Sequence, residues 1–433
     1  MKGAALAALA CLLTAASAAA HASLRESDPE PNAVLSEAPD AVVMRFTEPL
    51  ERGSISAEMF DQQGNPVLNT EARAGSGEYE MVLELPPVLP DGTYSVFWRT
   101  LSTADGHTAH SYFAFTIGTD ADASSVARPP GELLGSGPPQ WAVTVSRWAA
   151  LVGLAALVAA WPVWVGIIQP AVRPLSRSGP RITRLMRRFA LVTSVVAAVG
   201  SLLALVVQTM TLPGGSFLDQ LLSTLGQTRY GHVWLVRMGL IGLLGLVLAA
   251  CNWRAPRQRP MLAGAAGLVA VALPVPFSLM SHASAQTAGR TVAVAADALH
   301  LLAATLWGGG LLVLAVVLLP ALRRVAPKHR RAVLTMAIPR FSALALVAWA
   351  VMGMTGLYAG WLQVGSWEAL RSTAYGQALL VKLALLGGVL ALAAANLLVF
   401  QRRIERSSVI RTPFWSTRLR WAVGVEAALL LGV

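Results

Sequence analysis

The sequence predicts an immunoglobulin-like all-β sandwich fused to an all-α, polytopic membrane bundle of about eight helices in two repeats. Hydrophobic residues make up 55% of the 433-residue chain and charged residues 13%, which is too apolar for a soluble protein. Residues 21–118 break this pattern with short runs rich in Val, Phe, Tyr and Thr between turn residues. From residue 141 onward, apolar runs of roughly 20 residues follow one another, which is the length that spans a bilayer.

Residues 1–20 predict a secretory signal peptide, because one Lys precedes an Ala/Leu core that ends in small residues. Cleavage after the three alanines at 18–20 leaves His21 as the mature N-terminus, and cleavage after Ala18 or Ala22 also fits the pattern. The two cysteines are Cys11, in this leader, and Cys251. The mature extracytoplasmic part therefore lacks a thiolate pair, so a metal there would be bound through nitrogen, oxygen or methionine sulfur.

Residues 21–118 predict the sandwich and residues 119–140 a linker. Five runs have the composition of strands and are separated by Gly, Pro, Asn and Asp; they cover 41–46, 54–60, 79–85, 93–101 and 111–117. The linker is rich in Pro, Gly, Ser and Asp.

Residues 141–433 predict the membrane domain. An eighth helix begins at Trp421, but only 13 residues remain from there to Val433. Either the chain is truncated at this point or the last helix is incomplete. The other predicted helices lie near 141–168, 189–211, 231–251, 261–281, 292–319, 341–360 and 375–400.

An internal repeat runs through this domain. Stretches that start at Arg187 and Ser223 resemble stretches that start at Pro339 and Ser372. The resemblance indicates two four-helix halves in the same orientation, and binding sites in such proteins tend to lie between the halves.

Basic residues alternate between the predicted loops. The loops at 170–188, 252–260, 320–340 and 401–420 carry 21 Lys and Arg residues, whereas the other three loops carry one Arg each. The positive-inside rule places the basic set in the cytoplasm and the sandwich outside, as the signal peptide requires. We therefore expect a multi-pass protein of the bacterial cytoplasmic (inner) membrane with its N-terminal domain in the periplasm or extracytoplasmic space.

Nucleic acid is excluded as a partner, because the basic excess lies in these loops and residues 21–118 hold 15 acidic and 5 basic residues.

A first candidate metal site combines His21 with Asp105 and His107. A mature N-terminal histidine offers both its amine and its imidazole to one metal ion. A second imidazole and a carboxylate from the Asp105-Gly106-His107 turn complete a tetragonal set of nitrogen and oxygen ligands, which suits Cu(II). The nearby His110 is interpreted as an exposed polar residue.

Two motifs in this part resemble the CopC family of copper-binding proteins. HASLRESDPEPNAVLSEAPDAVVMRFTEPL resembles the family's opening segment, and STADGHTAHSYFAF resembles its closing motif. The resemblance covers residues 21–118 and implies a β-sandwich with a Cu(II) site at His21, Asp105 and His107. The domain has only three scattered methionines, at 44, 59 and 81, so we expect core packing and no Cu(I) site there.

A second group of candidate functional residues lies in the predicted membrane helices. Asp297 and His300 are three residues apart and share one helix face near its outer end, and His282 ends the preceding helix on the same side. An Asp in a span costs about 2.5–3.5 kcal/mol on insertion scales, so a function is the default interpretation. Met352 and Met354 in the next helix complete a candidate copper path. His232, at the outer end of another helix, is interpreted as an interfacial anchor.

The stretch SHASAQTAGRTVAVAADALHLLAATLWGGGLL and the repeat resemble the CopD membrane family over residues 141–433. The resemblance implies copper passage across the inner membrane. The glycines at 308–310 are interpreted as tight helix packing.

Together these features predict a non-enzymatic protein of copper homeostasis and resistance that binds Cu(II) outside and moves copper across the membrane, with uptake favoured over export. Periplasmic copper carriers are expected partners. The chain has no Walker motif and is not an ATP-driven pump by itself. The alternatives are a haem-containing electron-transfer protein or cupric reductase, which needs paired membrane histidines, and a copper sensor or buffer that transports nothing.

Overall fold

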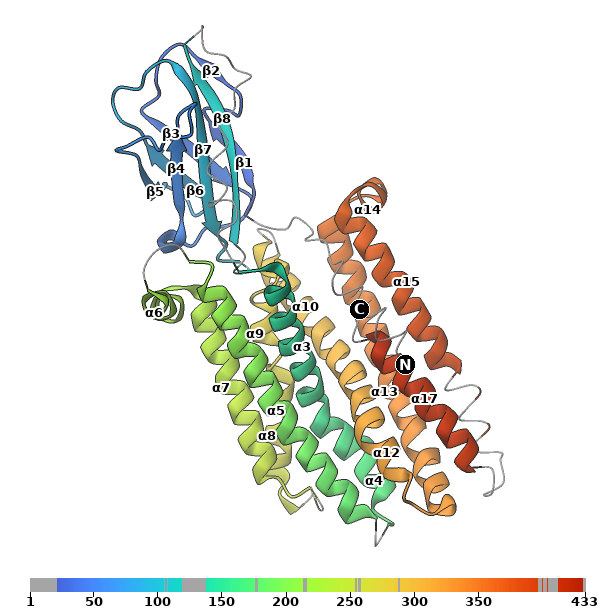
Figure 1. Cartoon of the computed structure of the whole chain (residues 1–433). Helices are drawn as coiled ribbons and strands as arrows, with labels where there is room; N and C mark the ends of the chain where they lie inside the picture. The colour runs from blue at the N-terminus through green and yellow to red at the C-terminus, as the bar shows by residue number, and fades with distance from the viewer. Residues whose placement is uncertain are drawn as a thin grey trace.

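A computed structural model describes residues 22–104, 106, 108–118, 138–175, 178–212, 216–253, 255, 258–286, 289–395, 399, 403 and 412–430. It consists of a β-sandwich that stands on one end of a helical bundle (Figure 1). That end of the bundle is called the sandwich end below.

The β-sandwich has two four-stranded sheets in the described residues. The first has the order β1 (Leu24–Asp28), β3 (Ala41–Phe46), β6 (Glu80–Glu84), β5 (Glu71–Ala74). The second has the order β2 (Val34–Leu35), β8 (Thr108–Ile117), β7 (Gly92–Leu101), β4 (Ser56–Phe60), in which only β2 and β8 pair in parallel. The predicted all-β fold of this part is confirmed.

Apolar side chains that alternate along the strands fill the space between the sheets. Met44, Met59 and Met81 are at most 1% exposed, which confirms their predicted role in the core. Phe46 and Trp98 pack edge to face with ring centroids 5.0 Å apart.

The outer face of the first sheet is polar. Arg45 donates hydrogen bonds to Glu26 and Glu80 on the two neighbouring strands, at 2.9 and 3.0 Å. The Arg45 guanidinium lowers the pKa of the Glu80 carboxyl.

The described bundle consists of helices of very different length, joined by turns. Those that form its body are α3 (Gln140–Val163), α4 (Gln169–Val172), α5 (Gly179–Thr209), α7 (Arg229–Ala250), α8 (Pro260–Ala272), α10 (Arg290–Ala304), α13 (Pro327–Val364), α15 (Ala374–Ala395) and α17 (Thr412–Leu430). Shorter segments are α6 (Phe217–Gln227), α9 (Val275–Ser278), the 3-10 turn His282–Ala285, α11 (Gly310–Val313), α12 (Leu319–Leu322) and α14 (Trp367–Ser372), with π turns at Trp164–Ile168, Thr305–Gly309 and Leu314–Leu318.

Seven helices in the described part of the chain are long and apolar enough to cross a membrane. The eighth predicted helix is present as α17, but it begins at Thr412 rather than Trp421 and carries Arg418, Arg420 and Glu426 within its 19 residues. Arginines can extend a helix beyond its apolar run because their methylene stems pack on apolar surface while the guanidinium reaches water. The same effect accounts for the early starts of α5, at Gly179 instead of 189, and of α13, at Pro327 instead of 341.

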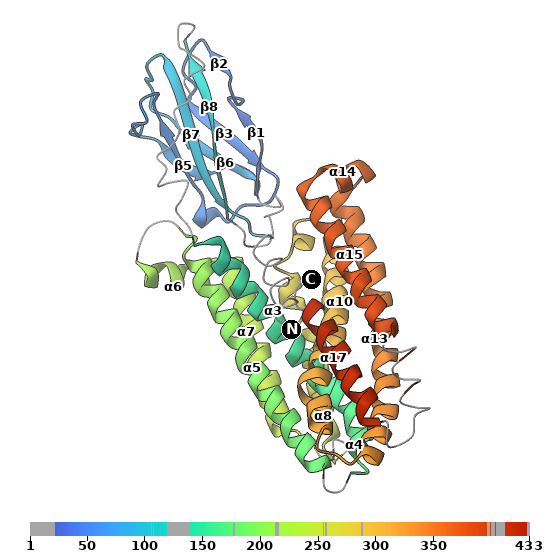
Figure 2. The ribbon, with the colours of Figure 1, turned by 45° about the vertical axis from the view of Figure 1, so that its right-hand side comes forward.

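The bundle has a packed centre and a loose edge. Of an apolar 18-residue stretch in the span that contains α3, 67% is buried, whereas 6% of the corresponding stretch in α15 is buried. Figures 1 and 2 both place α5 and α7 on one side of α3, and α13, α15 and α17 on the other.

Glycines at the centre let two helices meet closely. A Cβ at Gly309 would collide with the carbonyl oxygen of Ala155, and one at Gly310 would lie 2.7 Å from the ring of Phe341. The packing interpretation is therefore confirmed for these two glycines. Gly308 instead borders a cavity.

Candidate metal centre and membrane path

The three predicted Cu(II) ligands, His21, Asp105 and His107, lie outside the described residues. The residues next to them are described. Ala22 is buried, and its carbonyl oxygen accepts a hydrogen bond of 3.3 Å from the hydroxyl of Thr100, near the end of β7. The residue that follows His21 is thus held at the end of the sandwich from which the β7–β8 loop, residues 102–107, emerges.

Gly106, in this loop, meets the helical bundle directly. Its φ of +72° lies in the left-handed region that favours glycine, and its amide donates a 3.0 Å hydrogen bond to the carbonyl of Ser102. A Cβ at this position would lie 2.9 Å from the ring of Tyr230 and 3.0 Å from Cε of Met280. Both the turn and the close approach therefore require glycine.

Arg229, at the start of α7, connects the loop to the bundle. Its guanidinium donates hydrogen bonds of 2.6 Å to the carbonyl of Thr103 and 3.0 Å to the carbonyl of Leu279. Its backbone N–H donates a 3.1 Å hydrogen bond to the Glu51 carboxylate of the sandwich. In the sequence, Arg229 is only the one Lys or Arg of a predicted outer loop, and its contact with the sandwich was not predicted.

Ala104 provides a second point of attachment. Its carbonyl accepts hydrogen bonds from Arg229, at 3.3 Å, and from the hydroxyl of Ser284, in the 3-10 turn that follows α9. Both Ala104 and Ser284 are at most 3% exposed. The described part of the β7–β8 loop thus forms a buried contact between sandwich and bundle.

The candidate path residues lie in the bundle close to this contact, near the sandwich end. The Oδ2 atom of Asp297 lies 2.9 Å from the hydroxyl of Ser281, the residue before His282. Asp297 also borders a small cavity with Tyr358, and His300 hydrogen-bonds Thr355 at 2.9 Å. Asp297 and His300 therefore both face α13, in agreement with the predicted shared face.

The hydrogen bonds of Thr355 define which nitrogen of His300 carries the proton. The Thr355 hydroxyl donates to the carbonyl of Val351 at 2.7 Å, so its oxygen accepts from Nδ1–H of His300. The lone pair then resides on Nε2, which is the form of imidazole that binds a metal or a proton.

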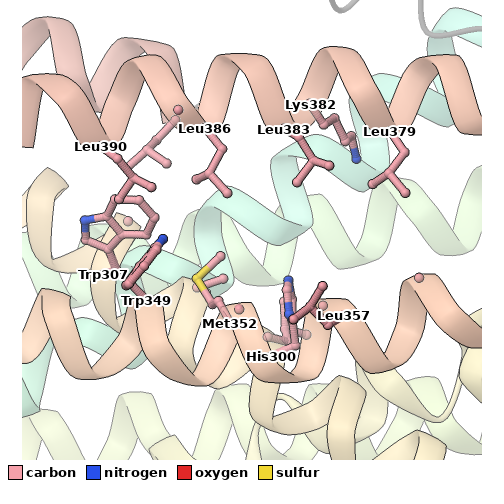
Figure 3. A pocket seen from close by; sticks show the side chains of 18 of the residues that line it. His300, Trp307, Trp349, Met352, Leu357, Leu379, Lys382, Leu383, Leu386 and Leu390 are labelled. Carbon is pink, nitrogen blue, oxygen red and sulfur yellow. The ribbon is translucent and has the colours of Figure 1, made fainter. Parts of the chain in front are cut away.

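A large apolar cavity of about 1010 Å³ opens beside His300. Figure 3 shows His300 and Met352 on one wall, with Lys382 and leucines of α15 opposite and Trp307 and Trp349 at one end. His300 and Lys382 are its only ionisable residues in the described lining.

The structure does not bring all of the predicted residues together. Met354 is 66% exposed on the outer face of α13, although Met352 lines the cavity. His232 is exposed, with Nε2 3.2 Å from the carbonyl of Gly226. His110 is likewise exposed on β8, as predicted. Within the described ranges, no three His, Cys, Asp or Glu side chains are close enough to hold a metal ion.

Three family models match consecutive parts of the chain. The CopC domain matches residues 24–118, the copper resistance protein D-like N-terminal domain matches 138–292, and copper resistance protein D matches 335–433. With the sandwich and the apolar helices, these matches define a membrane-bound copper resistance protein. The chain belongs to the family in which a CopC domain is followed by a CopD membrane domain.

Curated relatives match the whole chain or one of its parts. Copper transport protein CutJ of Bacillus subtilis (strain 168) is 28% identical over 428 residues, which cover 96% of this chain and 73% of the relative. Copper resistance protein D of Pseudomonas syringae pv. tomato is 30% identical, covering 48% of this chain and 67% of the relative. Protein YobA of Escherichia coli (strain K12) is 30% identical, covering 26% and 91%.

Solved structures match the sandwich. CopC from Methylosinus trichosporium OB3b is 28% identical, with a TM-score of 0.21, and the match covers 23% of this chain and 95% of the solved chain. PcoC, a methionine-rich copper resistance protein from Escherichia coli, is 28% identical, covers 23% and 99%, and has a TM-score of 0.21.

Proposed function

We propose that this protein captures Cu(II) at the end of its extracytoplasmic sandwich and moves copper inward across the cytoplasmic membrane. The observation that carries the proposal is the buried contact between the β7–β8 loop and the bundle. This loop contains two of the three predicted ligands, and it meets the bundle beside Ser281 and Asp297. An ion captured there has a short way to the first polar groups of the helices.

Capture uses the amine and imidazole of His21 with the side chains of Asp105 and His107. The Ala22–Thr100 hydrogen bond supports this arrangement, because it holds the N-terminal segment at the end of β7 from which the loop emerges. Two imidazoles, an amine and a carboxylate form the tetragonal N,O set that Cu(II) prefers.

Passage uses Asp297, His282, His300 and Met352. Asp297 supplies a negative charge that attracts a cation in a low-dielectric region, and His300 offers the lone pair of Nε2. Met352 adds a soft sulfur on the wall of the same cavity as His300. Met354 is not included, because it faces away from this group.

The proposed direction follows from the attached receptor, since a copper-binding domain fixed to the outer end of a membrane path suits delivery into it. Periplasmic copper carriers would load the sandwich. The haem alternative is less well supported, because His300 is the one histidine in the described lining of the large cavity. A visible spectrum without a haem band is expected for the purified protein.

Extending the chain by one residue before His21 should weaken Cu(II) binding at least about tenfold, since the extension moves the amine away from the metal. The measurement is a Cu(II) titration of the purified full-length protein, with the correctly processed chain as control. An affinity that the extension leaves unchanged would rule out the N-terminal ligand.

Reporter fusions should reveal the predicted orientation. Fusions at Ser178 and Arg257 are expected to report cytoplasm, and fusions at Gln220 and Ser366 the outside, because basic loops stay in the cytoplasm. One reversed site would refute the proposed topology, and with it delivery from an external sandwich into the cytoplasm.

A further inference from the structure

We propose that Met280 is the first copper ligand on the membrane side, and that it takes the ion directly from the sandwich while the two parts stay docked. The inference rests on the proposed capture of copper at the β7–β8 loop. It adds Met280, which lies outside the CopC-like and CopD-like motifs of the sequence. It also adds a mechanism in which copper passes between the two domains without release into solvent.

Met280 occupies the position that an acceptor requires. Its methyl carbon lies 3.0 Å from the place where a Cβ of Gly106 would be, and Gly106 stands between the two loop ligands in the sequence. Met280 is half-buried, at the join between α9 and the following 3-10 turn. A glycine at 106 is what allows the thioether to come this close to the loop.

The chemistry of a thioether suits such a role. Methionine sulfur binds Cu(I) and also serves Cu(II) as a long, weak axial ligand, so the transfer needs no electron. Three rotatable bonds let the sulfur swing between two positions without moving the backbone. A weak ligand beside the Cu(II) site can bind the ion while the loop ligands exchange, and it then releases the ion to the next ligand.

The next ligands are close to Met280. It precedes Ser281, whose hydroxyl lies 2.9 Å from the carboxylate of Asp297. His300 lies one turn further along the same helix, and Met352 shares a cavity wall with it. The order Met280, Asp297, His300, Met352 leads from the sandwich end into the bundle.

The contact around Arg229 indicates that sandwich and bundle transfer the ion while docked. One guanidinium joins the loop carbonyl of Thr103 to the carbonyl of Leu279, the residue before Met280. Hydrogen bonds from a charged donor are stronger than those from a neutral one. Arg229 therefore fixes the distance between the loop and Met280.

The test compares Met280→Leu with Met210→Leu in the full-length protein. Leucine keeps the volume but removes the sulfur, and Met210 is a half-exposed methionine at the sandwich end of α5, outside the contact. Met280→Leu should lower the initial rate of copper accumulation in cells about tenfold, while Met210→Leu leaves it unchanged. Cu(II) bound per purified protein should stay the same in both variants, which separates transfer from capture and from misfolding.

A disulfide tests docking. Ala104→Cys combined with Ser284→Cys is designed to form a bond across the contact, where the Ser284 hydroxyl donates a hydrogen bond to the backbone carbonyl of Ala104. The oxidised double variant is expected to accumulate copper like its reduced form. Full activity of Met280→Leu, or loss of uptake on oxidation that a reductant restores, would overturn the inference. A wild-type protein that accumulates no copper would instead contradict the proposed function.

Discussion

Replacing Asp297 and His300 together with alanine is expected to abolish copper accumulation while leaving Cu(II) binding by the sandwich intact. Asp297 is held by Ser281 and His300 by Thr355, so both are positioned within the bundle below the β7–β8 loop. Removing the carboxylate removes the charge that compensates a cation in a low-dielectric region, and removing the imidazole removes the next ligand. Accumulation in cells and Cu(II) titration of the purified protein measure the two effects separately.

His232→Ala is the matched control for this variant. His232 is a histidine at the same end of the bundle, but it is exposed, and its Nε2 lies 3.2 Å from the backbone carbonyl of Gly226. It should accumulate copper at the wild-type rate. The amount of protein in the membrane fraction must be equal in all variants, and normal accumulation by the double variant would refute Asp297 and His300 as path residues.

His107→Ala should weaken Cu(II) binding by the full-length protein at least about 100-fold. Replacing a residue that only hydrogen-bonds a metal ligand already costs about 10- to 100-fold in metal affinity, so the loss of a direct ligand belongs at or beyond the upper end of that range. His110→Ala, three residues further on, should have little effect, because His110 is an exposed residue of β8.

Titration with Cu(II) under anaerobic conditions measures both variants. An equal loss of Cu(II) affinity in His107→Ala and His110→Ala would mean that His110 is also a ligand. Unchanged affinity in both variants would place the Cu(II) site elsewhere. When external copper is limiting, copper accumulation in cells should fall as the Cu(II) affinity of the sandwich falls, because the sandwich delivers copper to the membrane path.

The sequence predicted those strands whose residues are apolar on at least one face. The prediction for 41–46 matches β3, and those for β4, β6, β7 and β8 overlap the observed strands. It missed the two-residue strand β2, and it missed β1 and β5, which lie at the edges of their sheet and have the sequences LRESD and EARA. Charged edge strands lack apolar alternation, since edges are protected by charge.

The candidate path could be predicted in part because helical spacing is visible in a sequence. The three-residue interval between Asp297 and His300 correctly placed both on one helix face, which the structure shows to be the face toward α13. Hydropathy alone did not distinguish Met352, which lines the cavity, from Met354, which is exposed.

The contact between sandwich and bundle could not be predicted in this way. Arg229 and Thr103 are separated by 126 residues, and the contact they form depends on how two folded parts meet. No local pattern marks Met280, Arg229 or Ser284, because each acts through a loop far away in the chain. The close approach at Gly106 is visible only in three dimensions.

Uptake of radiolabelled copper by proteoliposomes, with the sandwich facing the external solution, tests inward copper movement most directly. The purified full-length protein should carry copper into the lumen down its gradient, and the Asp297→Ala, His300→Ala double variant should match protein-free liposomes. Wild-type uptake no faster than that of protein-free liposomes, or transport only when the sandwich faces the lumen, would contradict the proposed inward path.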